Sequence, residues 1–150
     1  MPSLVNNKKA FFDYEIIETL DAGVELLGFE VKSAKSGRGS LAGARVLIRG
    51  GEAFLVGFDL PPYQPKNTPA GYDTARPRRL LLTKKEIATL AGTEARKGFT
   101  IIPLEVYTKA NKVKIKIAVV RGKKKFDKRE SIKKREDDRH AARILKRGEE

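Results

Sequence analysis

Three lysines alternate with branched apolar residues in the last apolar stretch of the chain. Lys112, Lys114 and Lys116 are each separated by a valine or an isoleucine. Because side chains alternate along a strand, this spacing predicts three ammonium groups on one face and branched side chains in a core. A row of lysines suits a phosphate backbone, which it contacts without reading bases. Protection of a sheet edge is the alternative, but the basic segment that follows favours RNA.

A second concentration of charge covers residues 121–150. It holds 13 Lys and Arg against 7 Asp and Glu, a net charge of +6. Helix-forming residues dominate and few residues are apolar, so we expect a segment that becomes helical only on an anionic partner. Phe126 lies among lysines and could stack on a base. A solvated charged tail without a function is the alternative.

Two further clusters could carry chemistry. Glu30, Lys32 and Ser33 bring an acid, a base and a hydroxyl near a glycine-rich loop, although Glu30 and Lys32 could simply be a surface pair of little energy. Arg76, Arg78 and Arg79 precede three leucines. Arginine forks suit phosphates and planar bases, and a basic approach to an amphipathic helix explains these arginines equally well.

Catalytic and metal-binding patterns are missing from the sequence. The chain has no Cys, and its one His is His140 in the basic tail. A Ser-His-Asp or Cys-His arrangement cannot be built from these residues, no glycine-rich phosphate loop follows a strand, and the carboxylates do not cluster as metal ligands. We therefore expect no cofactor, no metal and no enzyme activity, with an enzyme acting on RNA as a remote alternative.

Composition places the chain among basic globular proteins. Its 150 residues are 34 % charged and 40 % hydrophobic, with a net charge of +13 and a pI of about 10.0. Residues 1–120 alone carry +7. A field of this sign attracts nucleic acid or an anionic membrane. Neither a membrane-length apolar stretch nor a signal peptide is present, so we expect a cytoplasmic protein without a membrane partner.

The elements that must position these residues are mostly short strands. We expect a barrel domain at 1–121 and a basic tail at 122–150. The predicted fold is mainly β, a small closed or half-closed antiparallel barrel with a few short helices. Thr83 and Glu86 form a capping box, and Pro103 predicts a bulge or an edge in its strand. The expected elements are strands at 13–20 and 24–26 with a turn at 21–23, a helix at 28–33, a hairpin of 44–49 and 52–58, a long loop at 60–77, helices at 83–92 and 93–97, and strands at 99–108 and 112–121.

A set of motifs in fixed order covers nearly the whole chain. On these motifs the sequence resembles the SmpB family, the SsrA-binding proteins also called small protein B. The motifs are Asn7-Lys8-Lys9-Ala10 before Asp13-Tyr14, Glu18 with Ala22-Gly23, Gly28 to Ser33, Gly51 to Leu55, Arg78 to Leu82 with Glu86-Ile87, Gly98, Pro103-Leu104 before Tyr107, Gly122-Lys123-Lys124, and Asp127-Lys128-Arg129.

The resemblance implies an oligonucleotide-binding type of β-barrel (OB-fold) and a role in trans-translation. It implies binding to the transfer-RNA-like domain of transfer-messenger RNA (tmRNA) and delivery of that RNA to stalled ribosomes, where the tail probes the vacant messenger channel and the decoding centre. Elongation factor Tu is an implied partner, and we expect a monomer. A structural ribosomal protein and a general OB-fold RNA-binding protein are the alternatives.

The predicted site residues combine the resemblance with the patterns above. Arg79 stands where the family usually has Lys, and Phe126 where it often has His or Tyr, which keeps the stacking face and loses a hydrogen bond. The predicted RNA-binding residues of the barrel are Asn7, Lys8, Glu30, Lys32, Arg78, Arg79, Leu81, Lys112, Lys114 and Lys116. The predicted ribosome-binding residues of the tail are Lys123, Lys124, Phe126, Asp127, Lys128, Arg129, Lys133, Lys134 and Arg135.

Overall fold

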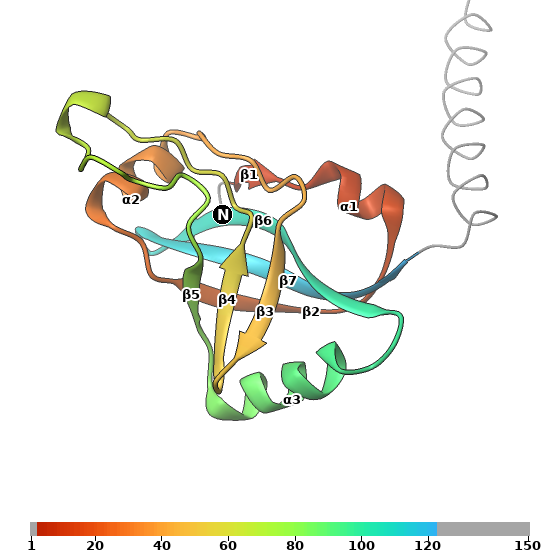
Figure 1. Cartoon of the computed structure of the whole chain (residues 1–150). Coiled ribbons are helices and arrows are strands. Elements are labelled where there is room, and N and C mark those ends of the chain that lie inside the picture. The colour runs from red at the N-terminus through yellow and green to blue at the C-terminus, as the bar shows by residue number, and fades with distance from the viewer. Residues whose placement is uncertain (1–2, 123–150) are drawn as a thin grey trace, which may run out of the picture.

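The computed structural model describes residues 3–122, which form one curved antiparallel sheet with three short α-helices packed around it (Figure 1). The seven strands lie in the order β1-β6-β7-β2-β5-β4-β3. The elements are β1 (Ser3–Asn6), α1 (Lys8–Asp13), β2 (Tyr14–Val24), α2 (Gly28–Lys35), β3 (Arg45–Arg49), β4 (Glu52–Val56), a 3-10 turn (Pro65–Asn67), β5 (Arg78–Leu81), α3 (Lys84–Glu94), β6 (Phe99–Lys109) and β7 (Lys112–Gly122).

The sheet curves into a half-closed barrel. Strand β3, at one edge, packs against β6 near the other edge, although the two strands are not paired. The interior holds the main core, in which Leu55, Ile101 and Ile115 are completely buried. A closed or half-closed antiparallel barrel with short helices was the predicted fold, and it is confirmed.

A second, smaller core lies on the outer face of β6 and β7. Helix α1 places Ala10 against Ile102, Leu104, Ala118 and Val120. Ala118 and Val120 follow the three lysines of β7 at the same period of two, so one strand face changes from cationic to apolar where α1 covers it.

Strands β6 and β7 form a long hairpin. Their two-residue turn, Ala110-Asn111, has φ values of 50° and 64°, as the hairpin turns that match strand twist require. The pairing shifts register between Pro103 and Glu105, which confirms the predicted bulge. Pro103 lacks an N–H to donate, and the bulge accommodates that missing ladder bond.

Several local predictions are confirmed. Helix α2 and the hairpin of β3 and β4 lie where expected, and the long loop between β4 and β5 contains only one 3-10 turn. At α3, the Glu86 N–H donates to Thr83 Oγ1 at 3.1 Å, and the Thr83 N–H donates to Glu86 Oε1 at 2.9 Å. These two bonds complete the predicted capping box.

Other local predictions are wrong. The predicted turn at residues 21–23 is part of β2, which runs unbroken from Tyr14 to Val24 because it pairs with β7 along this length. Helix α3 continues through Gly92 to Glu94 and takes the place of the predicted second helix. Strand β1, helix α1 and strand β5 had no predicted counterpart. No helix among residues 3–122 is long and apolar enough to cross a membrane.

Candidate nucleic-acid interface

The lysine ladder lies on β7 with the predicted alternation. The intervening Val113, Ile115 and Ile117 are buried, whereas Lys112 is exposed and the other two lysines are half-buried. The geometry of the ladder is therefore confirmed, and contact with RNA stays a prediction.

A row of residues crosses four strands at Lys114. Gly23 of β2 pairs with Lys114 on one side and with Leu81 of β5 on the other, and Lys114 pairs with Tyr107 of β6. Paired residues of neighbouring strands project to the same face, so these side chains share the outer face. We call Leu81, Gly23, Lys114 and Tyr107 the cross-strand row. It combines an apolar side chain that is 49 % exposed with an ammonium group.

Acidic residues flank part of the ladder. Lys116 pairs with Asp21 of β2 and with Glu105 of β6. The Tyr107 hydroxyl donates to Asp21 Oδ1 at 2.7 Å. Burial and this hydrogen bond raise the pKa of Tyr107 to about 12, so the phenol remains a donor. The ladder is therefore strongly cationic only toward the hairpin turn, where Lys112 pairs with the exposed Lys109.

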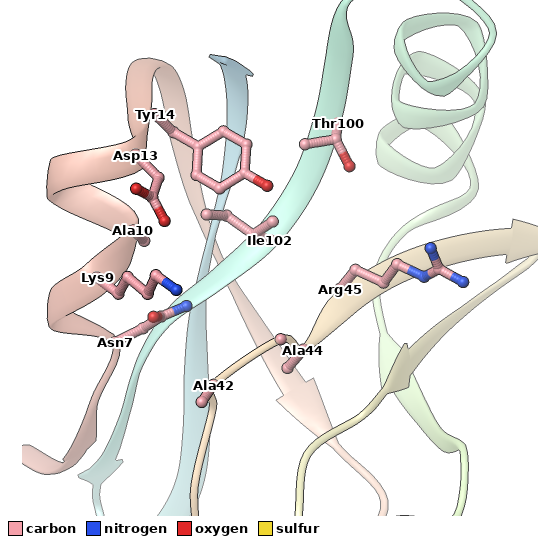
Figure 2. Close-up of a pocket in the computed structure, with 11 residues that line it drawn as sticks. Asn7, Lys9, Ala10, Asp13, Tyr14, Ala42, Ala44, Arg45, Thr100 and Ile102 are labelled. Atoms are coloured by element: carbon pink, nitrogen blue, oxygen red, sulfur yellow. The ribbon is translucent and has the colours of Figure 1, made fainter. Parts of the chain in front are cut away.

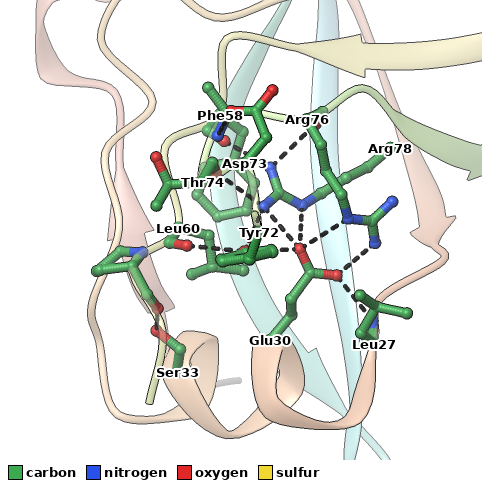
Figure 3. Close-up of polar contacts among 12 residues, drawn as sticks. Leu27, Glu30, Ser33, Phe58, Leu60, Tyr72, Asp73, Thr74, Arg76 and Arg78 are labelled. Carbon is green, nitrogen blue, oxygen red and sulfur yellow. Dashed lines mark hydrogen bonds and ion pairs between the residues drawn. The ribbon is translucent and has the colours of Figure 1, made fainter. Parts of the chain in front are cut away.

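Glu30 and Arg78 form a buried ion pair (Figure 3). Arg78 Nη2 and Nε lie 2.7 and 3.0 Å from Glu30 Oε2, and both side chains are 0 % exposed. Glu30 also accepts hydrogen bonds from Arg76 and, at 2.8 Å, from the N–H of Leu27. Burial raises the pKa of Glu30, but the bonds from Arg76, Leu27, Arg78 and Tyr72 outweigh it and lower the pKa to about 2.

The same ion pair fastens the long loop to the barrel. Arg78 donates to the carbonyl oxygens of Phe58 at 2.6 Å and Thr74 at 2.9 Å. The Tyr72 hydroxyl lies 2.9 Å from both Glu30 Oε2 and the Leu60 carbonyl oxygen. Glu30 and Arg78 have no accessible side-chain surface, so the prediction that they contact RNA directly does not fit the structure. They lie inside the scaffold beneath α2 and the loop.

Two other predicted residues are accessible. Arg79 is 46 % exposed at its side chain and lies 3.0 Å from Glu25 and 3.5 Å from Glu52. Exposed pairs of this kind contribute little energy, so the guanidinium can exchange a carboxylate for a phosphate at small cost. Lys32 is exposed on α2.

Asn7 and Lys8 differ in their surroundings. Asn7 is buried to 9 % exposure, and its Nδ2 and N–H donate to the carbonyl oxygens of Pro103 at 2.9 Å and Leu104 at 2.8 Å. Asn7 therefore fixes the start of α1 at the β6 bulge. Lys8 is exposed on α1.

A polar pocket lies beside α1 (Figure 2). It encloses about 430 Å³, and Lys9, Asp13, Tyr14 and Arg45 line it together with apolar residues of β6 and the segment before β3. Tyr14 pairs with Gly122, the last described residue of β7. The basic tail therefore continues from the end of the barrel that carries this pocket.

The predicted tail residues, Lys123 to Arg135, lie outside the described part of the chain, as does His140. Within residues 3–122, no group of three His, Cys, Asp or Glu side chains could hold a metal ion. Sequence patterns missed Asp21, Lys109 and Tyr107, which join the ladder only through the pairing of β7 with its neighbours.

The fold and the outer face define a class of protein, the basic β-barrels that present cations and exposed apolar side chains to nucleic acid. Comparison with known proteins identifies the family. The family model described as SmpB protein matches residues 4–147. The chain belongs to this family.

Relatives are similar over nearly their full length. An SsrA-binding protein of Microcystis aeruginosa is 46 % identical over 144 residues, which cover 96 % of this chain and 94 % of that protein. One of Thermosipho africanus is 46 % identical over 148 residues, covering 98 % and 99 % of the two chains. A solved chain described as "tmRNA-SmpB: a journey to the center of the bacterial ribosome" has a TM-score of 0.66 and 38 % identity, and the match covers 81 % of this chain and 85 % of that one.

Proposed function

We propose that this protein binds the transfer-RNA-like domain of tmRNA and delivers it to stalled ribosomes for trans-translation. The observation that carries this proposal is the 46 % identity to SsrA-binding proteins over 96 % of the chain. The solved tmRNA-SmpB chain with the same fold supports it. The protein makes or breaks no covalent bond in this role and acts by holding a folded RNA.

The cross-strand row supplies the centre of the RNA-binding face. Lys114 binds phosphate, and the exposed side chain of Leu81 packs against a sugar or base. Lys112 and Arg79 add cations on one side of the row, because β5 and β7 both run antiparallel to β2 and each residue lies two positions before a member of the row. Lys116 contributes less, because Asp21 and Glu105 lie opposite it on both neighbouring strands. Contacts of this type recognise the shape and backbone of a structured RNA.

The remaining predicted residues fall into two groups. Lys8 and Lys32 are exposed and contact phosphate directly. Asn7, Glu30 and Arg78 act through position, since their side chains hold α1, α2 and the long loop against the sheet. Because phosphate contacts release counterions, affinity for the RNA falls steeply with salt.

The ribosome and elongation factor Tu complete the proposed assembly. The basic tail enters the messenger channel of a stalled ribosome, with Lys123, Lys124 and residues 126–129 at the decoding centre. The charge of residues 121–150, a net +6, supports this role. Elongation factor Tu accompanies the charged RNA, and the protein acts as a monomer.

The RNA recovered with the protein from growing cells tests this proposal. Affinity-tagged full-length protein is isolated at moderate salt, and the bound RNA is sequenced. We expect tmRNA to dominate over ribosomal RNA once ribosomes are removed. Bulk ribosomal RNA in stoichiometric amounts, resistant to high salt, would instead identify a structural ribosomal protein.

A further inference from the structure

The long loop at 61–77 is fastened at both ends to α2 and to the segment just after it. Ser33 Oγ donates to the Pro61 carbonyl oxygen at 2.6 Å, and Arg38 Nη1 donates to the Tyr63 carbonyl oxygen at 3.2 Å. The buried pair of Glu30 and Arg78 holds the other end of the loop. Long connections without regular structure are commonly either functional or disordered. This loop has a defined path, so its surface can serve as a binding site.

The surface shared by α2 and the loop is cationic. Lys32, Lys35 and Arg38 are exposed on or just after α2, and Lys66 is exposed in the loop. Residues 28–40 and 61–77 contain two acidic residues: Glu30, which is buried and paired with arginine, and Asp73, which is exposed. The three exposed cations at the end of α2 and Lys66 therefore outnumber the one exposed acid of these two segments.

A groove of about 310 Å³ separates α2 from the loop. Its walls carry a lysine, two aromatic rings and two amides, from Gly28, Phe29, Lys32, Tyr63, Gln64 and Asn67. The Arg38 guanidinium lies over the Tyr63 ring, 5.7 Å from its centre, and Tyr63 remains 37 % exposed. A partly exposed ring beside cations is the arrangement on which unpaired bases stack.

We propose that this groove is a second RNA-binding site, separate from the cross-strand row, that takes one unpaired nucleotide of a structured RNA. The base stacks on Tyr63, the amides of Gln64 and Asn67 face its edge, and the flanking phosphates contact Lys32 and Lys66. The inference rests on the proposed function, because the same RNA supplies this nucleotide while its backbone lies on the cross-strand row.

The arrangement of the elements allows one RNA to reach both sites. Helix α2 packs against β7, the strand that carries the lysine ladder. Figure 1 shows α2 and the loop at the same end of the barrel as the β6–β7 turn. The groove therefore lies at the end of the barrel that the outer face of β7, with its row, also reaches.

Binding measurements on the full-length protein test the groove. Fluorescence anisotropy is recorded with the labelled transfer-RNA-like domain of tmRNA at several salt concentrations. Tyr63→Ala is expected to weaken binding at least about fivefold, and Tyr63→Phe to retain it, because stacking needs the ring and not the hydroxyl. Lys66→Gln is expected to lower the salt slope by about one. Lys97→Gln, at an exposed lysine after α3, is the matched control and leaves affinity and slope unchanged.

Two results overturn the inference. In the first, Tyr63→Ala binds the RNA as tightly as the wild type, and Lys66→Gln leaves the salt dependence of the affinity unchanged. The other is equal loss for Tyr63→Ala and Tyr63→Phe with an unchanged melting temperature, which excludes stacking. If Lys114→Glu still weakens binding in either case, only the groove fails and the proposed function stands. A twelve-nucleotide single-stranded RNA is the second probe. If the wild type does not bind the tmRNA domain but Tyr63→Ala lowers the affinity for this single-stranded RNA, the proposed function is wrong and the groove remains an RNA-binding site.

Discussion

Gly23 lies directly beneath the side chain of Leu81. A Cβ atom built on Gly23 would lie 3.2 Å from Leu81 Cδ1 and 3.3 Å from Leu81 Cβ. The backbone of Gly23 does not require glycine for its φ value, since it is not among the positive-φ residues. The glycine is thus needed for space, and it lets Leu81 lie flat on β2 beside Lys114.

Gly23→Ala is expected to lower the affinity for the transfer-RNA-like domain severalfold, because the added methyl lifts Leu81 out of the cross-strand row. Anisotropy with the labelled RNA measures this loss. Gly92→Ala is the matched control. It adds a methyl in open space within α3 and is expected to raise stability by about 0.5–1 kcal/mol without changing affinity. Equal affinities for the two variants would contradict the role of Leu81.

Lys114→Glu is expected to weaken RNA binding on the order of tenfold, since it replaces a phosphate contact by a repulsive charge. Stability should change by less than about 1 kcal/mol, because the side chain is half-buried on an outer face. Lys97→Glu carries the same charge change on the exposed segment after α3 and should bind nearly as the wild type. A large drop in melting temperature with unchanged affinity would show that Lys114 serves the fold.

Glu30→Gln is expected to destabilise the protein by about 3–5 kcal/mol, because it leaves the guanidinium of Arg78 buried without its counter-charge. Urea unfolding followed by circular dichroism measures the change. Glu15→Gln removes one partner of an exposed pair with Arg121, and the expected loss is at most about 1 kcal/mol. Comparable losses for the two variants would mean that the buried ion pair contributes no more to the free energy of unfolding than the exposed one.

The stability of the barrel is expected to fall in acid through Glu30. The pKa of this carboxyl is about 2 in the folded chain against 4.5 for the free group. The unfolded chain therefore binds the proton first, and the stabilisation is present above pH 4.5 and is lost as the pH falls from there toward 2. Unfolding midpoints at pH 6, 4 and 2.5 should converge for the wild type and Glu30→Gln. If the unfolding midpoints of the two proteins fall in parallel with pH, groups other than Glu30 cause the loss of stability in acid.

Truncation after Lys125 is expected to leave affinity for the transfer-RNA-like domain nearly intact and to abolish rescue of stalled ribosomes. The barrel provides the RNA-binding face in this proposal, and the tail provides the contact with the messenger channel. RNA binding is measured by anisotropy, and rescue by tagging of peptides on ribosomes stalled on a message without a stop codon. Loss of both activities would show that the two tasks are not divided at the end of β7.

Local signals in the sequence predicted the elements that depend on neighbouring residues. The alternation around Lys114 required a strand buried on one face, Thr83 and Glu86 supplied a helix start, and Pro103 required a bulge. A few neighbouring residues determine each of these features, so each can be predicted without knowledge of the rest of the chain.

Features that depend on distant partners were missed. Glu30 and Arg78 are 48 residues apart, and only the folded chain shows that they are buried together. The turn predicted at residues 21–23 was wrong because pairing with β7 keeps these residues extended despite Gly23. Helix α1 is short and is held by Asn7 on the β6 bulge, a contact across 96 residues that no local pattern contains.

Strand β7 is a spacer of fixed length. Lys114 and Gly122 are eight residues apart, about 26 Å at the rise of an extended strand. Because β7 is hydrogen-bonded to β2 and β6 on both sides, the pairing on both sides holds this separation. An RNA held at Lys114 therefore has a set offset from the point where residue 123 begins. Inserting two residues at matching positions of β2, β6 and β7 would move the one relative to the other by about 7 Å and would keep each side chain on its own face of the sheet.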